Sequence, residues 1–131
     1  MRVRSAALAL AFAGLFSTSC GGVVDPSKNQ TETFSGTLNL LDAKVFSFDV
    51  NHGGEFSVKL TQLSPTVTAI VLLRWGVAVG SDCSPIQQNN AVLNQTALAG
   101  AVLQTGRYCV LIGDIGFLTV PQTFTISVSH P

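Results

Sequence analysis

The stretch FSFDVNHGGEFSVKL, residues 46–60, alternates apolar and polar side chains on both sides of a Gly-Gly turn. Successive side chains of a β-strand point to opposite faces, so this period of two indicates strands with one buried face. Two alternating runs separated by a glycine turn are typical of a β-hairpin. The stretch therefore predicts two strands that pair with each other.

The same period of two recurs along the chain, at residues 34–40, 97–103, 108–112 and 124–130. Residues 67–75 are apolar on both faces, which is typical of a central strand covered on both sides or of a strand near a sheet edge that packs under a loop. The polar stretch 81–95 is expected to form a loop. No window shows the 3.6-residue period of a helix. Seven or eight short strands joined by turns predict an all-β fold, either a sandwich or a barrel.

The length and charge of the chain limit its class. It has 131 residues, of which 47% are apolar and 11% are charged. This length allows one domain, and the apolar fraction excludes a disordered chain. Seven basic residues balance seven acidic ones and are scattered along the chain, so the clustered cations that nucleic acids require are absent. Composition therefore favours one globular domain that binds no nucleic acid.

The N-terminus has the features of a secretory signal peptide. Arg2 and Arg4 precede the apolar segment 6–16, and small residues follow it. The segment is shorter than the roughly 20 residues that a membrane-spanning helix needs. A terminal helix of the folded domain is the alternative, but such a helix would show a polar face, which this segment lacks. We therefore predict a signal peptide at residues 1–19 and export of the chain.

The signal ends at Cys20 in the sequence LFSTSCGG, residues 15–22, which resembles the lipobox of bacterial lipoproteins. The resemblance implies cleavage before Cys20 and lipidation of this cysteine with acyl chains such as palmitate. Ser17 stands where the lipobox usually has leucine, so ordinary secretion, to the periplasm or the medium, is the alternative. The glycines after Cys20 resemble the outer-membrane sorting pattern. On this interpretation residues 20–31 are a flexible tether and residues 32–131 are the folded domain.

The cysteine count fits export. If Cys20 carries lipid, the remaining cysteines are an even pair, Cys83 and Cys109. Cysteines of exported proteins meet an oxidising compartment, where they are expected to form disulfides. A Cys83–Cys109 disulfide would stabilise the fold by roughly 3–4 kcal/mol on the chain-entropy model. Two separate buried thiols are the alternative. A zinc site is not expected, because there is no Cys-x-x-Cys and no paired histidine.

Several segments together resemble a known domain: FSGTL (34–38), FSFDV (46–50), GEFSVKL (54–60), GRYCV (106–110) and FTISVSHP (124–131). In this order they resemble the bacterial pre-peptidase C-terminal domain, a jelly-roll-like β-sandwich appended to secreted peptidases. The resemblance covers about residues 32–131, nearly the whole of the expected mature chain, and implies an antiparallel β-sandwich. It also implies accessory work, such as attachment to a surface or substrate, rather than catalysis. No peptidase is expected beside this domain, which leaves the targeting and surface roles and argues against a protease-linked role.

Candidate catalytic groups are few. A Gly-x-Ser-x-Gly nucleophile elbow is absent from the sequence. His52 lies in a turn and His130 lies next to the last residue, and both are expected to be exposed or to form caps. Asp49 and Glu55 flank the predicted hairpin, but they share its solvent-facing side and are expected to be solvated charges rather than a glycosidase pair. We therefore predict that the protein is not an enzyme.

Loop aspartates and aromatic rings are the remaining candidates for ligand binding. Asp82 and Asp114 are weak candidates for a calcium site, because aspartates in loops more commonly stabilise turns. Calcium is the one cofactor considered, and none is predicted. Trp75 and Tyr108 are expected in the core and Phe117 near the surface, and one surface ring does not make a sugar-binding platform.

These observations predict a lipid-anchored, non-enzymatic β-sandwich of the bacterial cell envelope. It would reach the membrane through its lipid anchor and act as an interaction or adhesion module toward an envelope protein or a glycan. The outer membrane is the expected location. The alternative function is that of a carbohydrate-binding or calcium-dependent accessory domain in a secreted system.

Overall fold

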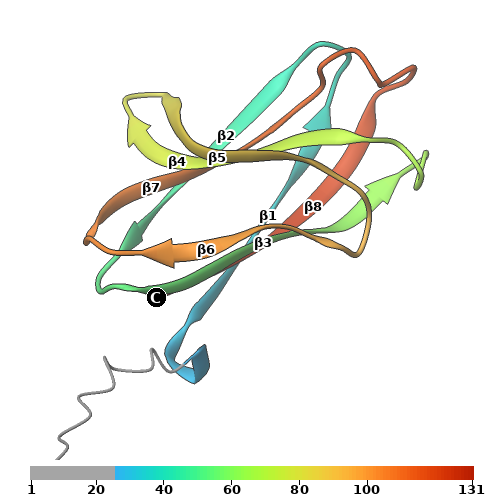
Figure 1. The fold of residues 1–131 in the computed structure, drawn as a ribbon. Helices are drawn as coiled ribbons and strands as arrows, with labels where there is room; N and C mark the ends of the chain where they lie inside the picture. The colour runs from blue at the N-terminus through green and yellow to red at the C-terminus, as the bar shows by residue number, and fades with distance from the viewer. Residues whose placement is uncertain (1–25) are drawn as a thin grey trace, which may run out of the picture.

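The computed structural model describes residues 26–131, and within this range the chain forms eight strands in two four-stranded sheets. A short 3-10 turn, η1 (Pro26–Lys28), comes first. The strands are β1 (Gln30–Leu38), β2 (Ala43–Val50), β3 (Gly54–Ser64), β4 (Val71–Val79), β5 (Asp82–Ala91), β6 (Thr96–Val102), β7 (Gly106–Gly113) and β8 (Gln122–His130). Figure 1 shows the two sheets packed face to face. The predicted antiparallel β-sandwich is confirmed.

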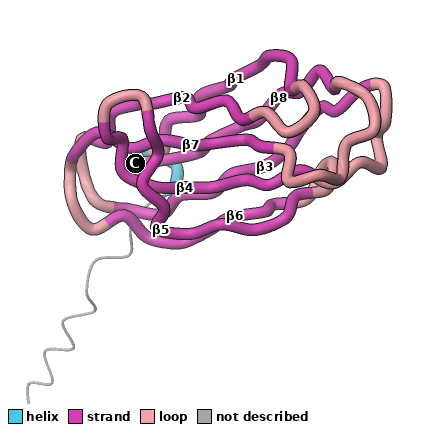
Figure 2. Tube along the Cα trace, turned by 90° about the horizontal axis from the view of Figure 1, so that it is seen from above, coloured by secondary structure: helices cyan, strands magenta, loops and turns pink. Residues whose placement is uncertain are grey.

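The two sheets have different members and enclose one core. The first sheet has the order β1-β8-β3-β6 and the second the order β2-β7-β4-β5, and all neighbours are antiparallel. The tube in Figure 2, seen from above, shows these strands running side by side along the long axis of the molecule. The rings of Phe56 and Tyr108 both stack on Trp75, with centroids 4.0 and 5.4 Å away. As predicted, Trp75 and Tyr108 are buried.

The predicted hairpin at residues 46–60 is wrong in its pairing. β2 pairs with β7 in the second sheet, whereas β3 pairs with β6 and β8 in the first. Residues 51–53 therefore cross from one sheet to the other. Phe48 and Phe56 approach Trp75 from opposite sheets. Alternation shows only that each run buries one face. Two strands paired in one sheet bury one face each, and so do two strands that face each other across the core, so the pattern does not distinguish these arrangements.

The prediction of a loop at residues 81–95 is also wrong, because β5 occupies most of it. β5 lies at the edge of the second sheet and has one hydrogen-bonded neighbour, β4. Gln87, Gln88, Asn89 and Asn90 are all exposed, so this strand carries polar residues on both faces and lacks alternation. Val67 and Thr68, expected in a strand, precede β4 and are exposed.

The strand directions collect the connecting loops at two ends of the sandwich, which we call the near end and the far end. The near end contains the start of β1 and the end of β8. It also contains the turns at residues 51–53, 80–81 and 103–105. At the far end lie the loops 39–42, 65–70, 92–95 and 114–121. In Figure 1 the near end is at the left and bottom and the far end at the right and top.

Candidate functional site

A buried carboxylate joins two loops at the far end. Asp114 follows β7 and accepts four backbone hydrogen bonds of 2.9–3.1 Å, donated by Leu41, Gly116, Phe117 and Leu118. Its own N–H donates to the carbonyl of Asp42 at 2.9 Å. Burial disfavours the charged carboxylate, but the backbone hydrogen bonds outweigh this effect and hold the pKa of Asp114 below its ordinary 3.8. The charged side chain therefore fixes the conformation of both loops.

The carboxylate also holds a backbone conformation that leucine rarely adopts. Leu41 has a φ of 57°, in the left-handed region where a side chain with a Cβ is disfavoured. Leu41 is 78% exposed, so apolar packing of its side chain does not offset the free-energy cost of this backbone conformation. The hydrogen bond from its N–H to Asp114 Oδ2 at 2.9 Å stabilises the conformation instead. As a result, Leu41 projects into solvent.

A second buried side chain, that of Gln122, attaches the loop 65–70 to this end of the molecule. Gln122, at the start of β8, is almost completely buried. Its Oε1 accepts the N–H of Thr66 at 2.8 Å, and its Nε2 donates to the carbonyl of Val120 at 3.2 Å. The loop that precedes β4 is thereby attached to the loop that precedes β8.

These three loops expose large apolar side chains, which we call the far-end patch: Leu40, Leu41, Val67, Ile115, Phe117 and Val120. The loops 39–42, 65–70 and 114–121 contain two charged residues, Asp42 and Asp114. Asp114 is buried, and Asp42 forms an ion pair with Lys44 at 2.9 Å. The patch is therefore uncharged. An exposed apolar patch of this kind is typical of an interaction site.

One member of this patch was predicted from the sequence, since Phe117 is half-exposed as expected. The other five, among them Leu40, Leu41 and Ile115, were not predicted. These leucines and the isoleucine lie in short loops between strands, where polar residues are usual. Their position in the sequence could therefore have indicated an exposed apolar surface. The alternating pattern had assigned Leu40 to a strand, but β1 ends at Leu38.

The two histidines have different surroundings, and the expectation for His130 is wrong. His52 is exposed in the turn between β2 and β3. His130 is completely buried and stacks on Phe48, with ring centroids 4.6 Å apart. Its Nε2 lies 3.0 Å from Glu32 Oε1, and its Nδ1 lies 3.0 Å from the carbonyl oxygen of Pro131. The ring thus connects β8 to β1 in its own sheet and to β2 in the other.

The acidic candidates are dispersed. Asp49 is exposed and lies 3.5 Å from Arg107, whereas Glu55 is on the other sheet. Asp82 is the first residue of β5, directly after the near-end turn, and Asp114 lies at the far end. The structure does not bring the two calcium candidates together, and the Asp114 carboxylate already accepts four hydrogen bonds. Within residues 26–131 no group of three or more His, Cys, Asp or Glu side chains is arranged to hold a metal ion.

The predicted Cys83–Cys109 disulfide is present, with Cα atoms 5.7 Å apart. It joins β5 to β7, although β4 lies between these strands in the sheet. Gly76 of β4 is the register partner of Cys109, and a Cβ at position 76 would collide with the carbonyl of Ser84. The absence of a side chain at Gly76 therefore lets β5 pass close enough for the bridge to form. Cys20 lies outside the described residues.

A shallow groove of about 650 Å³ lies on the first sheet, between β3, β6 and the segment before β1. Asn29, Glu55, Ser57 and Ser129 line it, together with small residues of β6. The Nδ2 of Asn29 donates to the carbonyl of Glu55 at 2.9 Å and to Ser129 Oγ at 3.3 Å. The Oδ1 of Asn29 is buried and has no hydrogen-bond partner among the described residues.

The sequence matches no protein-family model and no curated protein. Among residues 26–131, no helix is long and apolar enough to cross a membrane.

Proposed function

We propose that the protein is a lipid-anchored, non-enzymatic interaction module of the bacterial cell envelope, attached to the outer membrane through Cys20. The far-end patch is the observation that carries this proposal. Its apolar side chains are 41–78% exposed, and the buried carboxylate of Asp114 holds two of its loops in place. Exposed apolar surface that the fold holds in one conformation suits binding rather than catalysis. The resemblance to pre-peptidase C-terminal domains supports accessory work of the same kind.

The position of the patch indicates which partner it would meet. The chain leads toward Cys20 from the near end, and nine-residue β1 separates the two ends by about 30 Å. The patch therefore faces away from an anchoring bilayer. It carries no unpaired charge, since Lys44 neutralises Asp42. A groove of uncharged, apolar side chains on another envelope protein is the partner that this surface would fit.

The lipid anchor is tested by metabolic labelling with a fatty-acid analogue. We expect the wild-type chain to be labelled and to sediment with membranes. The Cys20→Ser variant should be unlabelled and soluble. The Cys83–Cys109 disulfide supports export to an oxidising compartment. A mature wild-type protein with an unmodified Cys20 would contradict the anchor and leave a secreted or periplasmic module.

The groove beside Asn29 favours a second candidate, a carbohydrate-binding accessory domain. Sugars are bound through many hydroxyl hydrogen bonds, and Glu55, Ser57 and Ser129 offer partners of this type. Binding on a glycan array that is lost in Glu55→Gln and kept in Asp49→Asn would support it. Repeating the array with a chelator tests whether calcium takes part. No binding in either condition would remove this candidate.

A further inference from the structure

A second group of exposed apolar side chains lies at the near end, and we call it the near-end patch: Val77, Val79, Ile86 and Leu103. Leu103, in the turn between β6 and β7, is 88% exposed. It lines two recesses of about 320 and 400 Å³. Val77 and Ile86 line the first recess together with Leu103, so side chains from three separate segments meet there.

The covalent chain brings this end close to Cys20. Asn29 fixes the start of the domain through its hydrogen bonds to Glu55 and Ser129. Five residues lie between Cys20 and Pro26, and an extended chain of that length reaches about 20 Å. An acylated Cys20 therefore holds the near end beside the bilayer. The far end lies roughly another 30 Å away, beyond the reach of so short a segment.

We propose that the near-end patch inserts into the bilayer interface and forms a second membrane contact beside the lipid anchor. The inference rests on the proposed anchoring at Cys20, which determines the end of the domain that faces lipid. Apolar side chains that enter the interface add to the binding that acyl chains supply. Leu103 is the side chain best placed to enter first, because it is the most exposed large apolar residue of residues 26–131.

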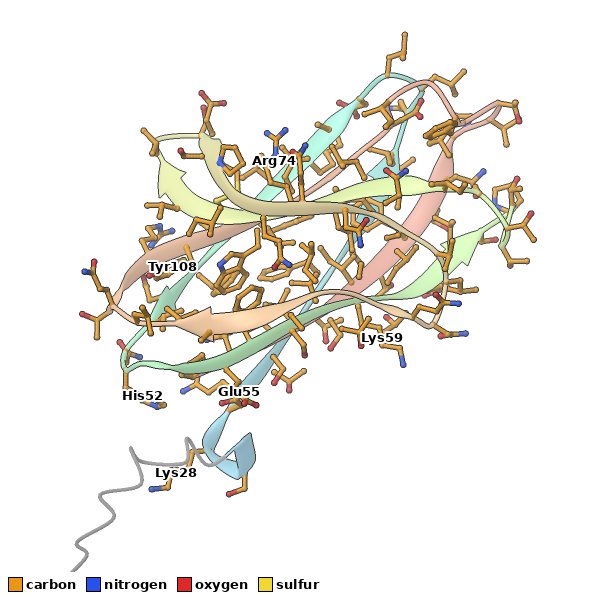
Figure 3. All side chains as sticks on the ribbon, in the orientation of Figure 1. Lys28, His52, Glu55, Lys59, Arg74 and Tyr108 are labelled. Atoms are coloured by element: carbon orange, nitrogen blue, oxygen red, sulfur yellow. A yellow bond between two sulfur atoms is a disulfide. The ribbon has the colours of Figure 1, made fainter. Side chains whose placement is uncertain are left out.

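The charges at this end indicate which lipids are needed. Arg107 pairs with Asp49 at 3.5 Å, and Lys28, Glu55 and Asp82 are exposed with mixed signs. Figure 3 shows Lys28, His52 and Glu55 around the start of the domain, with no cationic cluster among them. The contact is therefore apolar rather than electrostatic. We expect it on uncharged phosphatidylcholine vesicles, with little dependence on salt.

The experiment uses the anchored protein, purified from membranes and reconstituted into phosphatidylcholine vesicles that contain brominated acyl chains. A polarity-sensitive fluorophore is attached at Leu103→Cys or, as a matched control, at Leu41→Cys of the far end. The new thiol is free for labelling because Cys83 and Cys109 form a disulfide and Cys20 carries lipid. We expect a blue shift and strong quenching at position 103 and neither change at position 41.

Equal signals at both positions, or a stronger signal at position 41, would overturn the inference. An acylated protein without quenching at position 103 would contradict the second contact while leaving the anchor intact. If the chain carries no lipid, the labelled variants are added to preformed vesicles. In this arm Cys20 is replaced by serine, so that the new thiol is again the one that reacts. Quenching at position 103 that exceeds quenching at position 41 would then still support an apolar contact, and no quenching would refute it.

Discussion

The Oδ2 atom of Asp114 accepts the backbone N–H of Leu41 at 2.9 Å, across 73 positions of the sequence. The other oxygen of the same carboxylate accepts the N–H groups of Gly116, Phe117 and Leu118. One buried charge thus sets the positions of the exposed Leu41 and Phe117 side chains. The far-end patch is a fixed surface because of this carboxylate.

Asp114→Ala should destabilise the protein by about 2–3 kcal/mol, because buried backbone donors lose a charged acceptor. The free energy of unfolding is measured by urea denaturation. Asp42→Asn is the control, because Asp42 is on the same end but partly exposed, and it should leave the unfolding midpoint nearly unchanged. Equal effects of the two substitutions would contradict the structural role of Asp114.

The stability should also fall in acid through Asp114. Its pKa is lower in the folded state than the ordinary 3.8, so the folded state binds its proton less readily than the unfolded chain. The stabilisation is complete above pH 3.8 and is lost as the pH falls through the folded-state pKa. Urea denaturation over this range should show a smaller acid-dependent loss in Asp114→Asn. An unchanged pH profile in that variant would rule out this linkage.

Reduction of the Cys83–Cys109 disulfide should lower the free energy of unfolding by roughly 3–4 kcal/mol. Urea denaturation with and without a thiol reductant measures the difference. The Cys83→Ala/Cys109→Ala double variant should unfold like the reduced protein and should not respond to reductant. A response of the double variant would show that the reductant acts elsewhere.

Gly76→Ala should destabilise the protein by about 3 kcal/mol, because its Cβ would collide with the backbone of Ser84 at the register shift between β4 and β5. Gly80→Ala is a useful comparison. Gly80 has a φ of 59° but open space around a Cβ, so that substitution costs only local backbone strain, about 1 kcal/mol. Thermal unfolding of both variants distinguishes the two causes, and a milder effect at position 76 than at position 80 would contradict the crowding.

The sequence predicted the buried faces correctly because burial depends on local alternation. Trp75 and Tyr108 lie in the core for this reason. The pairing of the strands could not be predicted in the same way. Residues 46–60 would show the same alternation whether they formed a hairpin or two strands that face each other from different sheets. β5 was not predicted because this edge strand buries few of its side chains and its sequence therefore does not alternate.

The candidate site was predicted only in part, because its determinants are distant in sequence. The burial of His130 depends on Phe48 and on Glu32, which is 98 positions away. The role of Asp114 depends on Leu41 in another loop. The period of apolar residues along the sequence predicts neither the contacts of His130 nor those of Asp114. Phe117 was recognised as a surface residue, but Leu41 of another loop lies at the same end of the molecule only because of the fold.

The most direct test of the account is site-specific photo-crosslinking in cells from position 41 in the far-end patch. Position 127, on the outer face of β8, is the control. We predict one envelope-protein adduct from position 41 and none from position 127, with the adduct lost when Asp114→Ala releases the loop. No adduct from position 41, or the same adduct from both positions, would contradict an interaction module that binds through its far end.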